Sequence, residues 1–319
     1  MLLPYCNLRL EANSVITDLG CGPLTFTCAL WISRPDLRNI PLEINCVDRS
    51  APALEAGKKI FNALCGGNEN NKWKINLIKK EIDFRKTNPV LTSGNNKTEK
   101  KVSLVCAVNI FNEVYEKIPH NNTEALRQTA ANAAKLLSNE VSENPHAAVF
   151  IVEPGVPRSG EFISLLRGEL LKLGREPVSP CTHTAACPCL SLRKWCHFAF
   201  SAENAPKELL RLSISANLPK ERLVLSYLLA NTKGDSHLQS EQHLRIKPQN
   251  GVRHHLRVIS DAFPVGADYG RYGCCEQGLV LLKGEKNVIE KTASGSVVSI
   301  KINLNERDEK SGAYIGEII

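Results

Sequence analysis

The sequence predicts an α/β protein, in which a mostly parallel sheet with helices on both faces is followed by a smaller, cysteine-rich, β-containing C-terminal domain. Between residues 15 and 153, short apolar strands alternate with helical segments, which is the pattern of a parallel sheet. After Glu153 the alternation stops, and the thiol-rich segment CTHTAACPCLSLRKWCHF follows at 181–198. A chain of 319 residues is expected to form about two domains, and the predicted division is 1–175 and 176–319.

Each predicted element has a local signal. Strands are predicted from apolar, β-rich runs at 14–20, 42–48, 73–83 and 146–155, and the run 102–114 is predicted to be a buried strand that enters a turn. Helices are predicted from apolar residues at helical spacing at 21–37, 50–65, 122–141 and 160–174. Ser50 fits the N-cap of the second helix, and residues 88–101 form a polar loop. Later strands are predicted at 226–235, at 256–263 and through the glycine-punctuated tail 278–304.

Composition and charge limit the class of protein. Hydrophobic residues make up 43% of the chain and charged residues 23%, which is ordinary for a globular protein. No apolar run reaches the roughly 18 residues of a membrane span, and the first residues lack a signal-peptide core, so a cytoplasmic protein without membrane contact is expected. The net charge is +7, and residues 205–260 carry nine Lys and Arg against four Asp and Glu. This segment is predicted either to bind a polyanion or to be only a solvated basic face.

The most informative motif of the first domain is the glycine turn DLGCGPLTF, which places Gly20 and Gly22 between a strand and a helix. Glycines at such a turn take positive φ and let the backbone approach a ligand closely. Asp18, Asp48 and Asp83 are each expected to close a successive strand, where a carboxylate can accept hydrogen bonds from a ligand. The dinucleotide fingerprint needs a third glycine, and threonine stands at its position, so that form is excluded.

The shorter D-x-G-x-G form resembles motif I of class I S-adenosylmethionine-dependent methyltransferases, whose sheet is Rossmann-like. This resemblance implies a pocket for S-adenosyl-L-methionine. The residues that it implies for cofactor binding are Asp18, Gly20, Gly22, Asp48 and Asp83. The alternative is a methyltransferase-like fold whose pocket no longer binds or uses the cofactor.

The catalytic side of such a site has few candidates. The fourth strand, LVCAVNIFNEV, lacks the Asn/Asp-Pro-Pro-Tyr type of motif, and it lacks the Pro-Cys pair of a cytosine C5 nucleophile. The polar residues expected near the methyl donor are Asn109, Asn112 and Glu113. The sequence VEPG at 152–155 is interpreted either as lining of the same cleft or as ordinary turn chemistry. Whether the chain is an enzyme stays open.

The twelve cysteines favour metal binding over disulfides where they cluster, because a cytosolic chain is expected. Cys181, Cys187 and Cys196, with a fourth thiol from CCEQG, can hold zinc or an iron–sulfur cluster. Spacing alone leaves Cys274 and Cys275 open as the fourth ligand. Cys189 is then a spare thiol, and free thiols in a β-rich domain are the remaining alternative.

The thiol segment also carries the most specific resemblance in the chain. Cys181, His183, Cys187 and Pro188, followed by the WCHF box, are similar to the signature of the Rsm-twenty-two or methyltransferase-like-seventeen family. That is a family of small-ribosomal-subunit assembly proteins of mitochondria and bacteria. Further blocks occur in the family's order, namely ITDLGCGPLT, VFIVEPGVPRSG, KERLVLSYL and RVIS. Thr182 departs from the pattern, since the family usually has proline there.

This resemblance implies a class I methyltransferase fold joined to a small cysteine-rich domain, which holds a 4Fe-4S cluster in the mitochondrial members. It implies Cys181, Cys187 and Cys196 as three ligands. It selects Cys274 over Cys275, because family members carry a cysteine four residues before a glycine. It also implies small-subunit ribosomal RNA and ribosomal proteins as partners.

Three functions are consistent with these observations. The first is a ribosomal-RNA-binding assembly factor, monomeric off the ribosome, that docks through the basic 205–260 segment. The second is an active rRNA methyltransferase, with the donor methyl near Gly20 and Asp48. The third is an iron–sulfur redox sensor that controls RNA binding. The missing catalytic motif favours the first.

Overall fold

The computed structural model describes residues 8, 10–66, 71–84, 86, 101–203, 205–218, 221–232 and 254–319. The chain divides into two compact units, each built from segments distant in the sequence. The first unit combines 1–153, 165–180 and 227–243, and the second combines 154–164, 181–226 and 244–319. None of the helices in the described part of the chain has both the length and the apolar character that a membrane crossing requires.

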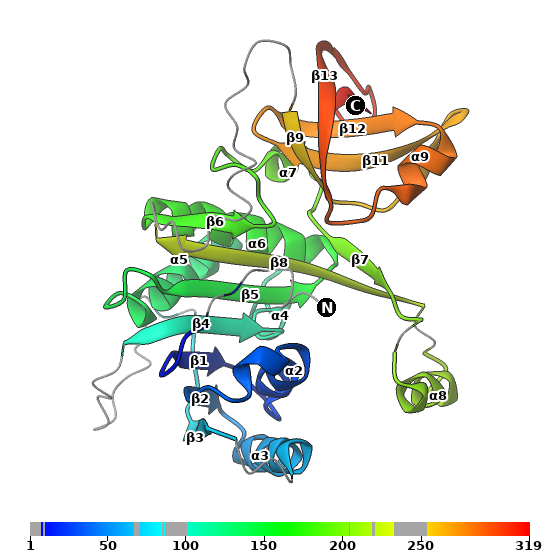
Figure 1. Ribbon diagram of the computed structural model, residues 1–319. Coiled ribbons are helices and arrows are strands. Elements are labelled where there is room, and N and C mark those ends of the chain that lie inside the picture. The colour runs from blue at the N-terminus through cyan, green and yellow to red at the C-terminus, as the bar shows by residue number, and fades with distance from the viewer. Residues whose placement is uncertain are drawn as a thin grey trace. The chain divides into compact units, whose positions relative to one another are not determined.

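The first unit is built on a sheet with strand order β3-β2-β1-β4-β5-β8-β6 (Figure 1). The pairs β1–β2, β1–β4, β2–β3 and β4–β5 are parallel, whereas β6 and β8 are antiparallel. The bounds are β1 Val15–Leu19, β2 Leu42–Asp48, β3 Trp73–Lys79, β4 Val102–Val108, β5 Ala148–Pro154, β6 Arg175–Ser179 and β8 Arg222–Thr232. This order confirms the predicted α/β class with a methyltransferase-like, Rossmann-like sheet.

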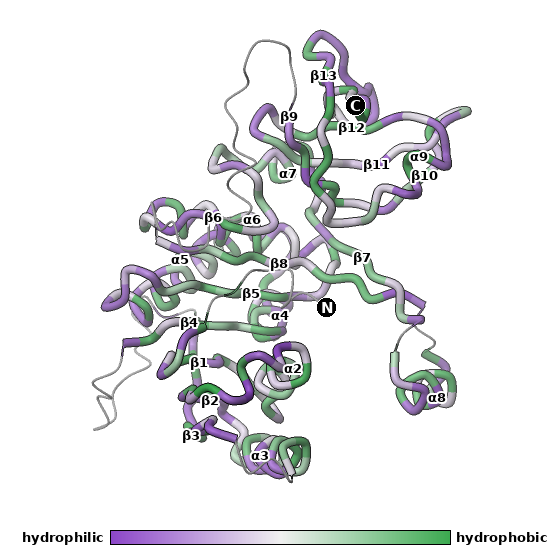
Figure 2. Tube along the Cα trace, viewed as in Figure 1, coloured by the Kyte–Doolittle hydropathy of each residue, from purple (hydrophilic) through white to green (hydrophobic). Residues whose placement is uncertain are grey.

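Helices cover both faces of this sheet. The bounds are α2 Thr25–Ser33, the 3₁₀ turn η1 Pro35–Leu37, α3 Ala51–Cys65, α4 Asn112–Tyr115, α5 Thr123–Glu140 and α6 Pro157–Lys172. Strands β1, β2 and β3 follow one another towards one edge of the sheet, whereas β4 and β5 follow one another in the other direction. Because the crossovers between parallel strands are right-handed, α2 and α3 lie on one face and α5 lies on the opposite face. β1 is buried along its whole length, and Figure 2 shows hydrophobic β4 beside it and hydrophobic β5 beyond β4.

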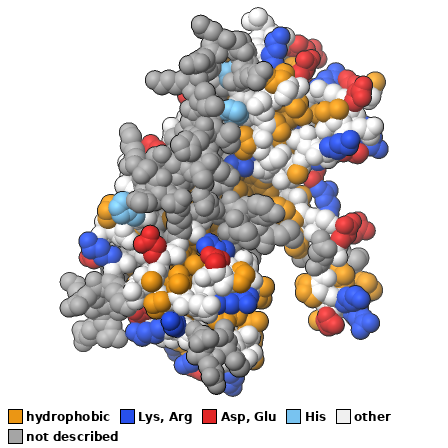
Figure 3. Space-filling model, in the orientation of Figure 1, with side chains coloured by type: hydrophobic (Ala, Val, Ile, Leu, Met, Phe, Trp, Pro, Cys, Tyr) orange, Lys and Arg blue, Asp and Glu red, His pale blue; other side chains and the backbone are white. Residues whose placement is uncertain are grey.

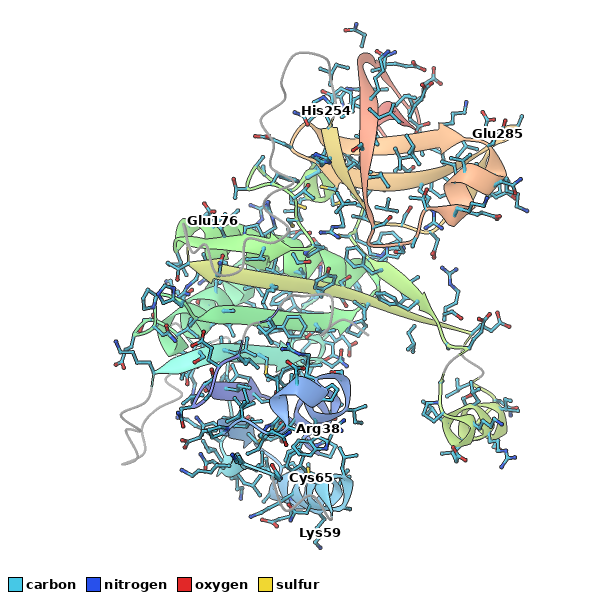
Figure 4. All side chains as sticks on the ribbon, viewed as in Figure 1. Arg38, Lys59, Cys65, Glu176, His254 and Glu285 are labelled. Atoms are coloured by element: carbon cyan, nitrogen blue, oxygen red, sulfur yellow. The ribbon has the colours of Figure 1, made fainter. Side chains whose placement is uncertain are left out.

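The helix after β2 begins where it is predicted. Ser50 Oγ accepts a hydrogen bond from the Ala53 N–H at 3.3 Å, as an N-cap does. Trp31, Phe61 and Trp73 pack together, with ring centroids 5.0 to 5.9 Å apart, and join α2, α3 and β3. Figure 4 labels Cys65 at the end of α3. These contacts hold α3 against the sheet edge next to the glycine turn.

The second unit ends in a closed barrel. Its strands are β9 His254–Val258, β10 Phe263–Val265, β11 Asp268–Cys275, β12 Gly278–Gly284, β13 Val297–Arg307 and β14 Tyr314–Ile318. Because β9 pairs with both β11 and β13, the ring β9-β11-β12-β14-β13 closes on itself. The helix α9, Lys286–Lys291, lies between β12 and β13 and contributes Ile289 to the barrel core. The predicted β-containing C-terminal domain is confirmed.

The rest of the second unit has few regular elements. Among its described residues, the elements that lie wholly within it are α7 Pro188–Ser191, β7 Phe198–Ser201 and α8 Lys207–Ser215, and β7 pairs with the first residues of β8. No residue of α8 is buried. Leu209, Leu212 and Ile214 are 57%, 67% and 64% exposed. Figure 3 shows hydrophobic and basic side chains intermixed on this helix.

Several predicted elements differ from the structure. The strand predicted at 73–83 ends at Lys79, so Asp83 lies beyond the strand. The last contact with β2 is the hydrogen bond from the Lys80 N–H to the Asp48 carbonyl (2.9 Å). The tail 278–304 is not wholly β, since Ile289 anchors the short helix α9. The strand predicted at 256–263 is divided between β9 and β10. Most of the polar loop 88–101 and the end of the strand predicted at 226–235 lie outside the described residues.

Candidate functional site

The predicted glycine turn lies at the carboxyl end of β1. Gly20 and Gly22 have φ values of +63° and +53°, which residues with a side chain rarely adopt. A Cβ on Gly20 would also lie 2.4 Å from Ile110 Cδ1, so a larger residue does not fit there. The Gly20 N–H donates to the Val47 carbonyl at 2.8 Å, which ties the turn to the end of β2.

Asp48 closes β2, as predicted, and holds the turn from the other side. Its Oδ2 accepts a hydrogen bond from the Gly22 N–H at 2.9 Å, and its Oδ1 accepts one from the Ser50 N–H at 2.8 Å. An ionised carboxylate has about four acceptor sites. Two therefore remain for the hydroxyl groups of a ligand.

A cavity of about 380 Å³ opens beside this turn. Its volume is in the range of small-molecule sites. Four of the predicted cofactor residues line it, namely Gly20, Gly22, Asp48 and Asp83. The other lining side chains include charged and apolar residues, among them Arg49, Lys80, Glu81, Ile82, Phe84, Ile110 and Val114.

Asp18 lies in the core of the sheet and is not one of the residues that line the cavity among those described. It is 1% exposed, with Cys46 and Cys106 at the matching positions of the neighbouring strands. The Cys106 thiol donates to Asp18 Oδ1 at 3.4 Å, whereas Oδ2 has no hydrogen-bond partner. Burial, together with the charge of Asp48, raises the pKa of Asp18 to about 7. The ligating atoms of Asp18, Cys21 and Cys46 lie within 4.8 Å of one another.

The three predicted catalytic candidates have different surroundings. Asn109 follows β4 with a φ of +54° and lines the cavity. Glu113 also lines it, and its carboxylate pairs with Arg49 at 3.1 Å. Asn112 lies at the start of α4, where its Oδ1 accepts a hydrogen bond from the Glu113 N–H at 2.9 Å. Asn109 and Glu113 thus both line the cavity, whereas Asn112 is not among its lining residues in the described part of the chain.

Glu153 is a residue that sequence reasoning missed. It is fully buried at the end of β5 and accepts hydrogen bonds from the N–H groups of Phe111 (2.9 Å) and Asn112 (3.1 Å). The Tyr115 hydroxyl donates a third at 3.1 Å. Burial raises the pKa of Glu153 to about 7 in spite of these hydrogen bonds. Glu153, the acid of the VEPG sequence, therefore fixes the turn after β4. The sequence signal that could have identified it is an acidic residue at the end of a buried strand.

The four predicted metal ligands come together in the second unit. Cys274 lies on β11, and its thiol interacts electrostatically with those of Cys187, Cys181 and Cys196. Burial, followed by these neighbouring thiols, raises the pKa of Cys274 well above its ordinary value. His183 is 5% exposed, and its Nε2 lies 3.2 Å from Cys274 Sγ. The cluster thus combines four thiols and a buried imidazole.

The two other thiols of this region lie in different surroundings. Cys275 points to the opposite side of β11 from its neighbour, because successive strand residues alternate, and it packs in the barrel core with Val280 and Leu282. Cys189 is buried in α7. Its hydrogen bond with Cys187, followed by burial, raises the pKa of Cys189. Cys189 therefore adjoins the cluster, whereas Cys275 faces away from it.

The WCHF box attaches this segment to the start of α6. Trp195 Nε1 donates to the Gly155 carbonyl at 3.2 Å. A Cβ on Gly160 would lie 2.6 Å from Trp195 Cβ, so this close contact requires glycine. The Ser226 hydroxyl donates to the Cys196 carbonyl at 2.7 Å. Packing and hydrogen bonds on both sides thereby position Cys196.

The basic segment predicted at 205–260 is described only in part. Residues 219–220 and 233–253 lie outside the described residues, and His237 and His243 are among them. The predicted docking of RNA on this segment stays a prediction.

Its described cations divide between surface and core. Lys207 and Arg211 are exposed on α8, and Arg222 forms an ion pair with Asp261. Arg257, by contrast, is 5% exposed and donates to a backbone carbonyl at 2.6 Å. Among the described cations of the segment, Arg257 therefore belongs to the core rather than to the surface.

Comparison with protein families gives a match that spans most of the chain. The family described as mitochondrial small ribosomal subunit Rsm22 matches residues 14–259. This chain belongs to the Rsm22 family. The Rsm22 match contains the glycine turn and Cys181, Cys187 and Cys196, and it ends before Cys274. The predicted family resemblance is confirmed.

Solved structures similar to this Rsm22 family member include three methyltransferases. One is a SAM-dependent methyltransferase from Thiobacillus denitrificans in complex with S-adenosyl-L-homocysteine (14% identity, 71% of this chain and 88% of that chain covered, TM-score 0.37). Another is precorrin-6y C5,15-methyltransferase from Geobacter metallireducens (12%, 72% and 84%, TM-score 0.35). The third is Haemonchus contortus phosphoethanolamine N-methyltransferase 2 in complex with S-adenosyl-L-methionine (9%, 70% and 50%, TM-score 0.31).

The chain spans half the length of the Haemonchus protein. Because the TM-scores are low, the fold assignment for this Rsm22 family member rests on its own strand order. A search of curated proteins found no match.

Proposed function

We propose that this chain is an assembly factor of the small ribosomal subunit that binds small-subunit ribosomal RNA. The observation that carries the proposal is the match over residues 14–259 to a family described by the small ribosomal subunit of mitochondria. The same family match supports ribosomal proteins of that subunit as further partners. The methyltransferase-like sheet and the cysteine cluster are then parts of one binding protein.

The cavity beside the glycine turn is proposed to bind S-adenosyl-L-methionine. Gly20 and Gly22 expose backbone without a side chain, and Asp48 keeps two acceptor sites for ribose hydroxyls. Asp83 and Phe84 offer a polar and an apolar contact on the cavity wall. The cavity therefore fits the cofactor in size and in chemistry. When bound, the cofactor supplies an electrophilic methyl group.

The surroundings of the catalytic candidates favour assembly over methyl transfer. Glu113 is already paired with Arg49, and the Asn112 side-chain oxygen already accepts a backbone N–H. Because of these contacts, neither the Glu113 carboxylate nor the Asn112 side-chain oxygen is positioned to orient a methyl acceptor. Active rRNA methylation is the second candidate function, and the observation that favours it is the open cavity with Asn109 on its wall.

The thiols of Cys181, Cys187, Cys196 and Cys274 are proposed to hold a 4Fe-4S cluster. Cys274 is buried on β11, and its thiol neighbours those of Cys187, Cys181 and Cys196. Four thiolates are a ligand set for a 4Fe-4S cluster and for a structural zinc ion. The family resemblance favours the cluster. Cys275 is unsuitable because it faces the barrel core.

Metal analysis tests the cluster and its ligands. After anaerobic purification, wild type is expected to contain about four irons per chain and to show a broad visible absorption band. Cys274→Ala should lose both, whereas the adjacent Cys275→Ala should keep both. One zinc ion and no colour would contradict the cluster. Loss of iron in Cys275→Ala alone would contradict the choice of ligand.

Cosedimentation with small ribosomal subunits, combined with a methyl-transfer assay, tests the function. The wild-type chain is expected to sediment with the particles and to transfer no labelled methyl group to their RNA. Methyl transfer that disappears in Asp48→Ala would replace the assembly proposal with the enzymatic one. A chain that neither sediments with particles nor modifies their RNA would contradict both.

A further inference from the structure

The C-terminal barrel has the connectivity of an oligonucleotide-binding (OB) fold. Its strands β9, β11, β12, β13 and β14 close in the order first, second, third, fifth, fourth. The third and fifth strands are parallel, the other neighbours are antiparallel, and α9 lies between the third and the fourth. OB folds bind oligonucleotides on the outer face of the second and third strands and on the adjoining loops. That face is formed here by β11 and β12.

Part of this face is covered by the chain itself. Leu279 and Leu281 alternate with the core residues Val280 and Leu282 along β12 and therefore point outward. They are nevertheless only 1% and 2% exposed, and α7 contacts β12. The cysteine segment thus closes the end of the face around Cys274.

Beside the covered part lie aromatic rings that are only half-buried. Tyr272, on the outer side of β11, packs on Phe263 from the β9–β11 connection, with ring centroids 5.0 Å apart. Trp195 and His197 stack with centroids 5.2 Å apart and planes 26° apart. Neighbouring rings of this kind form the platforms on which single-stranded bases stack.

Hydrogen bonds connect the backbone segments that carry the two ring pairs. The Ile259 N–H donates to the Tyr272 carbonyl at 2.9 Å, and the Ile259 carbonyl accepts from the His197 N–H at 3.3 Å. The Tyr272 N–H donates to Ser260 Oγ at 2.8 Å. Both ring pairs are therefore held by the start of the β9–β11 connection, which is one of the ligand-binding loops of an OB fold.

Cations lie on the same surface. Lys194 Nζ is 5.2 Å from the centroid of the Tyr272 ring. Arg193 is exposed next to it, and Arg222 is 51% exposed beside Asp261 at the β9–β11 connection. A polyanion that stacks its bases on the rings would place phosphates near these cations. We call the surface formed by Lys194, Trp195, His197, Phe263 and Tyr272 the ring surface.

We infer that the ring surface binds single-stranded RNA. This inference rests on the proposed binding of ribosomal RNA, and it adds the class of RNA and the place where it binds. Unpaired bases stack on Phe263, Tyr272 and the Trp195 pair, and Lys194 contacts a phosphate. Double-stranded RNA is excluded by the same geometry, because paired bases do not expose the faces that the rings need.

Fluorescence anisotropy with a labelled ten-nucleotide oligouridine tests the inference on the full-length chain. Phe263→Leu is expected to weaken binding about tenfold, since one stacked base is lost. Lys194→Gln should weaken binding and reduce the slope of log affinity against log salt by about 0.7, because one phosphate contact is lost. The matched control is Lys286→Gln, since Lys286 lies 5.2 Å from the Tyr269 ring elsewhere on the barrel. This control should change neither the affinity nor the slope of log affinity against log salt.

Three results would overturn the inference. One is equal binding of a ten-base-pair RNA duplex, and another is unchanged affinity in both ring-surface variants. The third is a loss in Lys286→Gln as large as that in Lys194→Gln. Cosedimentation separates this inference from the proposed function. A chain that sediments with small-subunit particles but does not bind the oligonucleotide contradicts the ring surface alone.

Discussion

The cofactor cavity and the cysteine cluster are assembled in opposite ways. The cavity is lined by residues that follow neighbouring parallel strands, and hydrogen bonds between the ends of β1 and β2 hold Gly20 and Asp48 in place. In the cluster, Cys274 lies on a strand of the barrel. The other three thiols come from residues 181–196, whose regular structure is limited to the four-residue helix α7.

The two sites differ in the contacts that hold their functional side chains in place. A sheet fixes the ends of its strands without help from a ligand, because the ladder hydrogen bonds already determine their positions. A segment with little regular structure depends more on its side-chain contacts, and a bound metal then supplies folding free energy to it. The comparison therefore predicts that loss of the ligand leaves the cavity intact and loosens the cluster.

Removal of the proposed metal should have the largest effect. In Cys196→Ala, amide hydrogen exchange across residues 181–197 is expected to accelerate by at least about 100-fold, because several kcal/mol of local stability are lost. Exchange in β1 and β4 should stay as slow as in wild type. The control is Cys28→Ala, in helix α2 of the first unit. If the thiol segment stays protected without metal, its own packing holds it, and the contrast with the cavity disappears.

The buried acids of the first unit should give the next largest effect, through pH. The pKa of Asp18 is raised from 3.8 to about 7, and that of Glu153 from 4.5 to about 7, in both cases chiefly by burial. At a pH between the ordinary pKa and the raised pKa, each acid keeps its proton in the folded state, whereas it has released that proton in the unfolded state. The free energy of unfolding therefore falls as pH rises from about 4 to about 7, by on the order of 3 kcal/mol for each acid.

Asp18→Asn should remove its share of this dependence, because the amide does not ionise. Urea unfolding at several pH values measures the effect, and the control is Glu55→Gln, an exposed acid on α3. An unchanged pH dependence in Asp18→Asn would show that this carboxyl is not protonated in the folded chain.

The two sites also differ in how much of each was predictable. The glycine turn and the thiol segment were located because their signals are local, whereas the register of seven paired residues in β2–β3 was not predicted. The orientation of Cys274 and Cys275 follows from alternation only once β11 is known to pair with β9 and β12. The burial of Asp18 and the role of Glu153 depend on strands that are distant in the sequence. Such contacts leave no local pattern.

Asp48 gives a smaller effect that is confined to the cavity. Asp48→Asn is expected to weaken the binding of S-adenosyl-L-homocysteine about 10- to 100-fold, because a hydrogen bond to a charged group contributes about 1.5–3 kcal/mol. Isothermal titration calorimetry measures this, and iron content should stay that of wild type. The control is Asp36→Asn, whose carboxylate pairs with Arg34 away from the cavity. Equal affinity in wild type and Asp48→Asn would contradict the proposed ribose contact.

The smallest effects come from a matched pair of glycines in α6. A Cβ on Gly160 would lie 2.6 Å from Trp195 Cβ, whereas a Cβ on Gly168 would have no neighbour within 4 Å. Gly160→Ala should therefore lower the free energy of unfolding by about 1–3 kcal/mol through overpacking. Gly168→Ala should raise it by about 0.5–1 kcal/mol through helix propensity. Urea unfolding measures both, and equal signs would contradict the close contact at Trp195. If Gly160→Ala also lowers the iron content, packing on α6 helps to position Cys196. Contacts within the protein then hold the cluster as well as the cavity, and the two sites differ only in how much they depend on those contacts.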